Sequence, residues 1–212
     1  MIEQFVDWLV NLIQTLGYPG VAISMFLESF FAPIPSEMIL PFSGFVASLG
    51  SLNIYLVIIV ATISAYLGSL PFYFLGVWGQ DWVNKFLNKY GKYFFINKKD
   101  VDLAYKSFDK YGNTIVFFGR LIPIVRTFIS FPAGVSKMNF IIFSIYTLAG
   151  TMIWSALLGY AGFLLGDNWN IVIDYISKYE KIIIAVIAII IVLYLGRGIY
   201  TTFIKKENGK KK

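Results

Sequence analysis

Three apolar stretches of this sequence are each long enough to cross a lipid bilayer. They cover residues 53–79, 139–166 and 182–204. A helix needs about 20 residues to cross the hydrocarbon core, and each stretch exceeds that length. Over the whole chain 58% of the residues are apolar, whereas about 45–50% is typical of soluble domains. The sequence therefore predicts an all-α polytopic membrane protein with about three spanning helices, the first two of which end near Gly79 and Gly166.

Two further apolar stretches, residues 18–52 and 113–135, do not fit simple spans. Each carries two ionisable side chains among several prolines. These residues are Glu28, Pro33, Pro35, Glu37 and Pro41 in the first stretch and Arg120, Pro123, Arg126 and Pro132 in the second. Broken backbone and charge are tolerated at membrane depth only where protein or a water-filled cavity surrounds them. We therefore predict two re-entrant helical hairpins that form a central site. The expected helix breaks are at Pro33, Pro35, Pro123, Pro132 and Gly134.

Hairpin and span follow each other twice along the chain. In residues 1–79 they come after a segment at 2–16 whose apolar side chains have helical spacing, which is typical of an amphipathic helix at the membrane interface. Residues 80–166 repeat the order of amphipathic segment, hairpin and span. We therefore predict a single membrane domain over 1–212, with two repeats, a last span and a basic tail at 205–212.

The distribution of basic residues predicts how these elements are oriented. No Lys or Arg occurs in residues 1–84, whereas 85–110 carries seven lysines and 205–212 carries five. By the positive-inside rule both basic segments are cytoplasmic, which places the C-terminus inside and the two hairpins on opposite sides. An inverted repeat of this kind builds midplane substrate sites in secondary transporters. Because the lysines lie beside apolar spans, they favour anionic lipid headgroups over nucleic acid as a partner.

The ionisable residues of the hairpins suggest the chemistry of the site. Glu28 and Glu37 would point in opposite directions on an unbroken helix, and the prolines between them could let both face one cavity. Buried carboxylates are candidates for binding protons or a cation. Arg120 and Arg126 suit a phosphate group, because a guanidinium makes several directed hydrogen bonds and keeps its charge when desolvated. Salt bridges between the arginines and the carboxylates are the structural alternative.

The sequence contains no His and no Cys. The nucleophiles and proton shuttles that many lipid-phosphate enzymes use are therefore missing, and we expect no metal or other cofactor. A small cation/proton transporter that uses the same carboxylates stays an alternative, and a membrane lipid-phosphate enzyme is a weaker one. A homo-oligomer also stays open.

Three stretches resemble the DedA family of membrane proteins, the bacterial branch of the SNARE-associated or VTT-domain proteins. They are FLESFFAPIPSEMILPFSGFVA at 26–47, YLGSLPFYFLG at 66–76 and FFGRLIPIVRTFISFPAGVSKMNFIIFSIYTLAGTMIW at 117–154. The chain has Ser69 where many members have Asp, and Val77 where many have Arg. The resemblance implies re-entrant hairpins and a place in the bacterial cytoplasmic membrane.

The resemblance also implies functional residues and a substrate class. The family's functional acids match Glu28 and Glu37, and its functional arginines match Arg120 and Arg126. The implied activity is recycling of undecaprenyl phosphate or movement of phospholipid, coupled in some members to the proton gradient. We therefore expect a flippase in which the arginines hold the lipid phosphate and the carboxylates bind protons.

Overall fold

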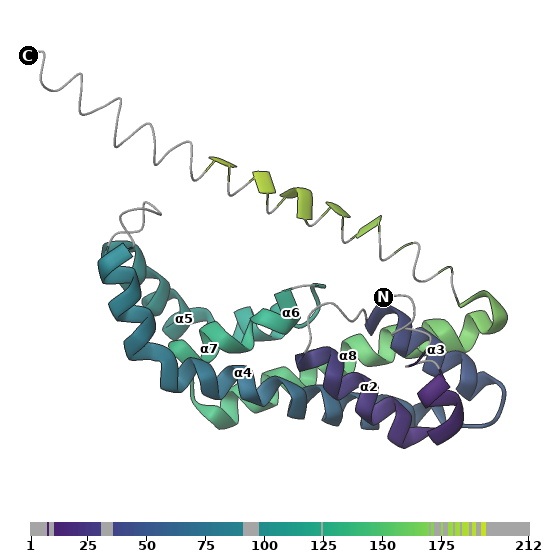
Figure 1. The fold of residues 1–212 in the computed structure, drawn as a ribbon. Coiled ribbons are helices and arrows are strands. Elements are labelled where there is room, and N and C mark those ends of the chain that lie inside the picture. The colour runs from purple at the N-terminus through teal and green to yellow at the C-terminus, as the bar shows by residue number, and fades with distance from the viewer. Residues whose placement is uncertain are drawn as a thin grey trace, which may run out of the picture.

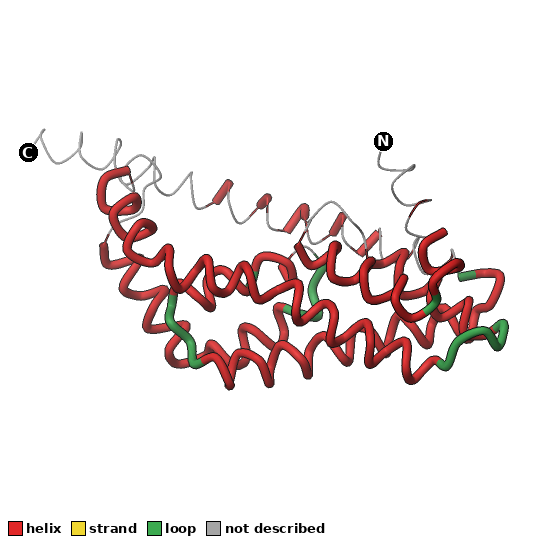
Figure 2. The backbone as a smooth tube through the Cα atoms, turned by 60° about the horizontal axis from the view of Figure 1, so that its bottom comes forward, coloured by secondary structure: helices red, strands yellow, loops and turns green. Residues whose placement is uncertain are grey.

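The computed structural model describes residue 8, residues 11–30, 36–90, 98–123 and 125–169, and separate positions between 171 and 193. Within this part of the chain all regular structure is helical, and Figure 2 shows helices joined by loops without a strand. The all-α prediction is therefore confirmed for the described residues. The helices are α2 (Tyr18–Phe30), α3 (Ser36–Ser48), α4 (Ile54–Tyr90), α5 (Lys98–Gly119), α6 (Val125–Phe128), α7 (Ser130–Val135), α8 (Phe140–Leu165) and the 3-10 helix η2 (Gly166–Asn168).

Helices α4 and α8 are long and apolar enough to cross a membrane, over Ile54–Phe86 and Phe140–Asn168. Each begins after an asparagine whose side chain caps free amides of the first turn. Asn53 Oδ1 accepts a hydrogen bond of 2.9 Å from the amide of Tyr55, and Asn139 Oδ1 accepts one of 2.9 Å from the amide of Ile141. Helix α8 ends at Gly166, whose φ of 52° favours glycine.

Two helices are longer than the sequence patterns suggest. Helix α4 continues through Gly79 to Tyr90, so its 37 residues extend over about 55 Å. No proline occurs between Gly79 and Tyr90, and the stacked rings of Trp82 and Phe86 support the extra turns. Helix α5 runs without a break from the expected amphipathic segment into residues 113–119, which we predicted as the start of a hairpin.

Three other predicted segments are only partly covered by the structure. Of the amphipathic segment at 2–16, residue 8 and residues 11–16 are described, and they are helical. Pro33 and Pro35 lie outside the described residues. The last span at 182–204 is described only at separate positions up to 193, and it stays a prediction.

Helices α4 and α8 run antiparallel and organise the other helices. The methyl end of Ile54 lies beside Gly159, and the Tyr66 hydroxyl is 2.7 Å from that of Ser144. Figure 1 shows α2 and α3 toward one end of this pair and α5 to α7 toward the other. Helices α2 and α7 pack on α4, while α3 and α5 pack on α8.

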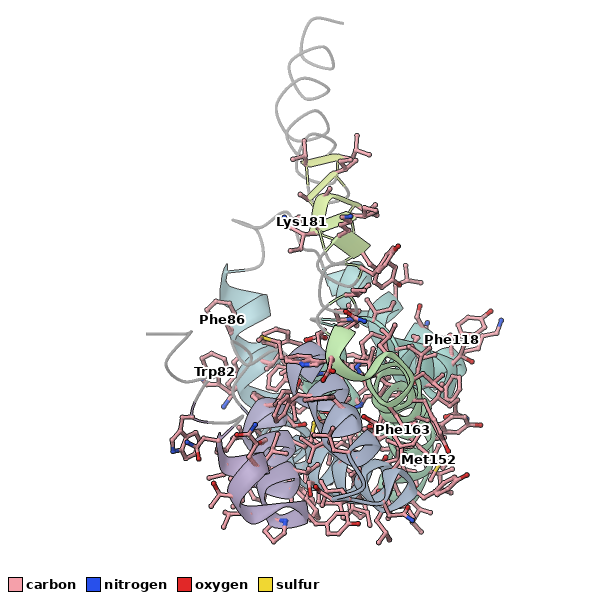
Figure 3. All side chains as sticks on the ribbon, turned by 90° about the vertical axis from the view of Figure 1, so that its right-hand side faces the viewer. Trp82, Phe86, Phe118, Met152, Phe163 and Lys181 are labelled. Carbon is pink, nitrogen blue, oxygen red and sulfur yellow. The ribbon has the colours of Figure 1, made fainter. Side chains whose placement is uncertain are left out.

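Many large apolar side chains of the described residues lie on the surface. Figure 3 shows Trp82 and Phe86 on one side of the molecule and Phe118 and Met152 on the other, and all four are exposed. The buried polar or charged residues include two arginines, a glutamate and many hydroxyl side chains. A wide apolar surface, with charged groups buried beside an apolar core, fits lipid as the surrounding solvent.

Candidate anion and proton site

Polar side chains from several helices meet at one buried cavity. Glu28 and Ser29 lie in the last turn of α2, Arg120 directly after α5, and Arg126 in α6. The residues that line the cavity are Glu28, Ser29, Ala65, Arg120, Arg126, Thr127 and Thr151. The free space has room for about one water molecule. The site is therefore closed to a phosphate group in this conformation.

Arg126 and Glu28 form an ion pair across the site. Arg126 Nη2 donates to Glu28 Oε1, and both side chains are more than nine-tenths buried. The second carboxylate oxygen of Glu28 accepts a hydrogen bond of 3.2 Å from the Ser29 hydroxyl. The Arg126 guanidinium also lies 5.7 Å from the centre of the Trp154 ring, within the range of a cation–π contact. For this pair, the salt bridge that we gave as the structural alternative is therefore present.

Arg120 has a neutral partner instead. Its Nη2 donates a hydrogen bond of 2.7 Å to the Ser130 hydroxyl. Its buried Nε has no hydrogen-bond partner among the described residues. A Cβ added at Gly150 would lie 2.8 Å from the Arg120 Cβ, so the missing side chain at Gly150 makes room for the arginine against α8. Arg120 is therefore the guanidinium with spare hydrogen-bonding capacity.

The site carries more positive than negative charge on the residues that line it. Two guanidinium groups face one carboxylate. Glu37 is half-buried in the first turn of α3, and its charge acts on Glu28, although it does not line the cavity. In a medium of low dielectric constant the unbalanced positive charge favours an anion.

The other residues expected to break helices lie close to the site in the chain. Pro123 is buried in the turn between α5 and α6. Pro132 and Gly134 both lie within α7, which continues through them, because a proline is tolerated in the first turn of a helix. Pro41 lies inside α3 and cannot donate to the carbonyl group of Glu37.

Sequence reasoning missed the neutral residues of the site. Ser29, Thr127, Ser130 and Thr151 contribute hydroxyl groups, and Trp154 contacts Arg126. A usable signal exists for Thr151, because hydroxyl side chains recur every four residues in the otherwise apolar α8. Among the described residues no three His, Cys, Asp or Glu side chains are close enough to hold a metal ion.

Apolar helices around a buried ionic site define a membrane protein with a polar centre. Residues 34–164 match the VTT domain. The chain belongs to this family, the DedA family of membrane proteins, as its sequence motifs indicated.

Curated relatives match most of the chain. Undecaprenyl phosphate transporter A of Bacillus subtilis (strain 168) is 35% identical over 194 residues, which cover 92% of each chain. A Lactococcus lactis subsp. cremoris (strain MG1363) protein named alkaline phosphatase-like protein is 36% identical over 201 residues, covering 94% of this chain and 92% of the relative. Protein DedA of Escherichia coli (strain K12) is 28% identical over 163 residues, covering 76% of this chain and 70% of the relative. No solved structure matches the chain.

Proposed function

We propose that this protein moves undecaprenyl phosphate, or a related anionic lipid, across the bacterial cytoplasmic membrane. The observation that carries the proposal is the meeting of Arg120 and Arg126 at one buried cavity. A phosphate headgroup is costly to bring into hydrocarbon, and paired guanidinium groups lower that cost by neutralising and hydrogen-bonding it. The name of the Bacillus subtilis relative supports a polyprenyl phosphate as the substrate.

In this mechanism the lipid phosphate and the Glu28 carboxylate compete for Arg126. The ion pair closes the site, so the phosphate binds when Glu28 gives up the guanidinium. Protonation of Glu28 removes its charge and releases Arg126, which couples proton uptake to lipid binding. Glu37 contributes a second carboxylate whose charge acts on Glu28. The prenyl tail stays in the bilayer throughout.

The proposed architecture is an inverted repeat with two re-entrant hairpins. Its support is the equivalent packing of α3 on α8 and of α7 on α4. A Cβ added at Gly44 would overlap the Gly159 carbonyl oxygen, and one added at Gly134 would overlap that of Tyr73. Gly162, three residues further along α8, lies equally close to the backbone of α3. Gly76, three residues further along α4, lies similarly close to the backbone of α7.

A lipid-phosphate phosphatase is the second candidate, which the name of the Lactococcus relative favours. It would use the same anion site but release inorganic phosphate. A cation/proton transporter would use the carboxylates alone, and its activity would not depend on lipid phosphate.

The test uses purified protein in vesicles that contain a fluorescent polyprenyl phosphate. Dithionite added outside bleaches only the outer leaflet, so the slow second phase of bleaching measures movement of the lipid. We expect Arg120→Lys and Arg126→Lys each to slow this phase by about 100-fold, because a point charge loses the bidentate grip. Arg197→Lys, at the remaining arginine of the chain, is the matched control and should retain the wild-type rate.

Wild-type rates in both site variants would remove the phosphate-site proposal. Release of inorganic phosphate without lipid movement would favour the phosphatase instead. Proton flux that is independent of the lipid phosphate would favour the cation/proton transporter.

A further inference from the structure

Helix α8 carries a straight row of buried hydroxyl groups that passes through the site. The α8 hydroxyl row consists of Thr147, Thr151 and Ser155, each at most 5% exposed. Their spacing of four residues keeps them on nearly one side of the helix over about 12 Å. Thr151, in the middle, lines the cavity together with Glu28 and both arginines. The row therefore extends from the site by one helical turn in each direction.

All three hydroxyl groups lack a hydrogen-bond partner among the described residues. Ser24 of α2 is a further buried hydroxyl group without a partner among the described residues, but other buried hydroxyl groups bond to their own helix. Thr62 donates to the carbonyl of Ile58 at 2.7 Å, and Ser43 donates to that of Ile39 at the same distance. The hydroxyl groups of the row make no such bond and are available to a molecule outside the helix.

Further unsatisfied donors belong to side chains at the site. The indole Nε1 of Trp154 and the Nε of Arg120 are buried and have no partner in the described part of the chain. Buried polar groups are almost always hydrogen-bonded, and several unsatisfied groups in one place indicate ordered water. Apolar side chains would pack better at these positions if the row were dry.

We propose that the α8 hydroxyl row takes up a file of water molecules when the site opens, because the closed cavity has room for only about one. This file would lead to the cavity and carry protons to Glu28. The role of the row in proton transfer rests on the proposed function, whereas the presence of water in it does not. Glu28 faces Arg126 of α6, Arg120 after α5, the hydroxyl of Ser29 and the charge of Glu37 on α3. The row approaches this cluster from α8, and α8 has no charged residue along the row.

The first test asks whether the row is wet. The chain has no cysteine, so Thr147→Cys, Thr151→Cys and Ser155→Cys can each be probed with silver ions, without lipid substrate or a proton gradient. Ala61→Cys is the matched control, since Ala61 is equally buried but lies in the apolar core. We expect the three row positions to react at least about tenfold faster than position 61, because a thiol ionises where water solvates it.

Reaction at position 151 alone would show an isolated cavity and overturn the file, and so would reaction at none of the three. Because this readout needs no transport, it stands whether or not the protein moves lipid.

The second test asks whether the row serves proton movement. Thr147→Val and Ser155→Ala remove hydroxyl groups outside the cavity lining while keeping the shape of the side chains. We expect each to slow proton-driven lipid movement by about tenfold while leaving binding of the polyprenyl phosphate unchanged. Thr62→Val, which removes a hydroxyl already bonded within its own helix, is the control. Wild-type rates in both row variants, in a protein that does move lipid, would overturn the role in proton movement and leave the proposed function intact.

Discussion

The ion pair between Arg126 and Glu28 leads to a quantitative prediction about stability. Arg126→Gln would leave the Glu28 carboxylate, which is 4% exposed, with the 3.2 Å hydrogen bond from Ser29. Breaking a buried ion pair by removing one partner costs about 3–5 kcal/mol, because the other charge stays buried. Glu28→Gln likewise leaves the buried Arg126 guanidinium with only a neutral acceptor, so we expect a loss in the same range.

The double variant separates the ion pair from the cost of each side chain. Two glutamines at positions 28 and 126 bury no charge and can bond to each other. We therefore expect the double variant to be more stable than Arg126→Gln alone, with a coupling energy of about 2 kcal/mol or more. The free energy of unfolding can be measured by titrating SDS into mixed micelles and following the fluorescence of the five tryptophans, one of which is Trp154 beside the guanidinium.

An exposed carboxylate provides the control for this cycle. Asp109 lies on the exposed face of α5, and Asp109→Asn should change the free energy of unfolding by less than about 0.5 kcal/mol. Additive effects at positions 28 and 126, each as small as that of the control, would refute the ion pair. The competition between phosphate and Glu28 would then lose its physical basis.

Two further predictions concern packing and orientation. Gly134→Ala should destabilise the protein by about 1–3 kcal/mol, because its Cβ would overlap the Tyr73 carbonyl oxygen. In Gly79→Ala the added Cβ meets no atom within 4 Å, so this variant should stabilise α4 by up to about 1 kcal/mol. Equal effects of the two variants in the same unfolding assay would contradict the close helix contact. In intact cells, a membrane-impermeant thiol reagent should label Ser51→Cys but not Lys98→Cys until the membrane is opened, and labelling at position 98 from outside would overturn the orientation inferred from the lysines.

The sequence was sufficient to identify the two long apolar helices and the charged residues of the site, because both depend on local patterns. Apolar length identified α4 and α8, and charge at membrane depth singled out Glu28, Arg120 and Arg126. The ends of the helices were harder to predict from the sequence. Gly79 resembles a helix end in sequence, yet α4 continues through it because nothing beyond it stops the helix.

Pairing between distant residues could not be read from the sequence. Arg126 and Glu28 are 98 positions apart, and composition does not say which arginine meets which carboxylate. The hydroxyl partners were missed for a related reason. Ser and Thr are common in membrane helices and usually bond to their own backbone, so Ser130 and Thr151 stand out only when their surroundings are known.

The unequal partners of the two arginines suggest an order of events at the site. Arg120 is held by a neutral hydroxyl and has an unsatisfied Nε, so an approaching phosphate can bond to it without displacing a charge. Arg126 becomes available only when Glu28 releases it. Protonation of Glu28 would therefore come first, since it frees Arg126 and opens the site, and the phosphate would then bind to both guanidinium groups. Because the pair joins α2 to α6, its exchange for a phosphate would also loosen a contact between the two halves of the chain. Lipid binding, proton uptake and movement of the halves would then be parts of one event.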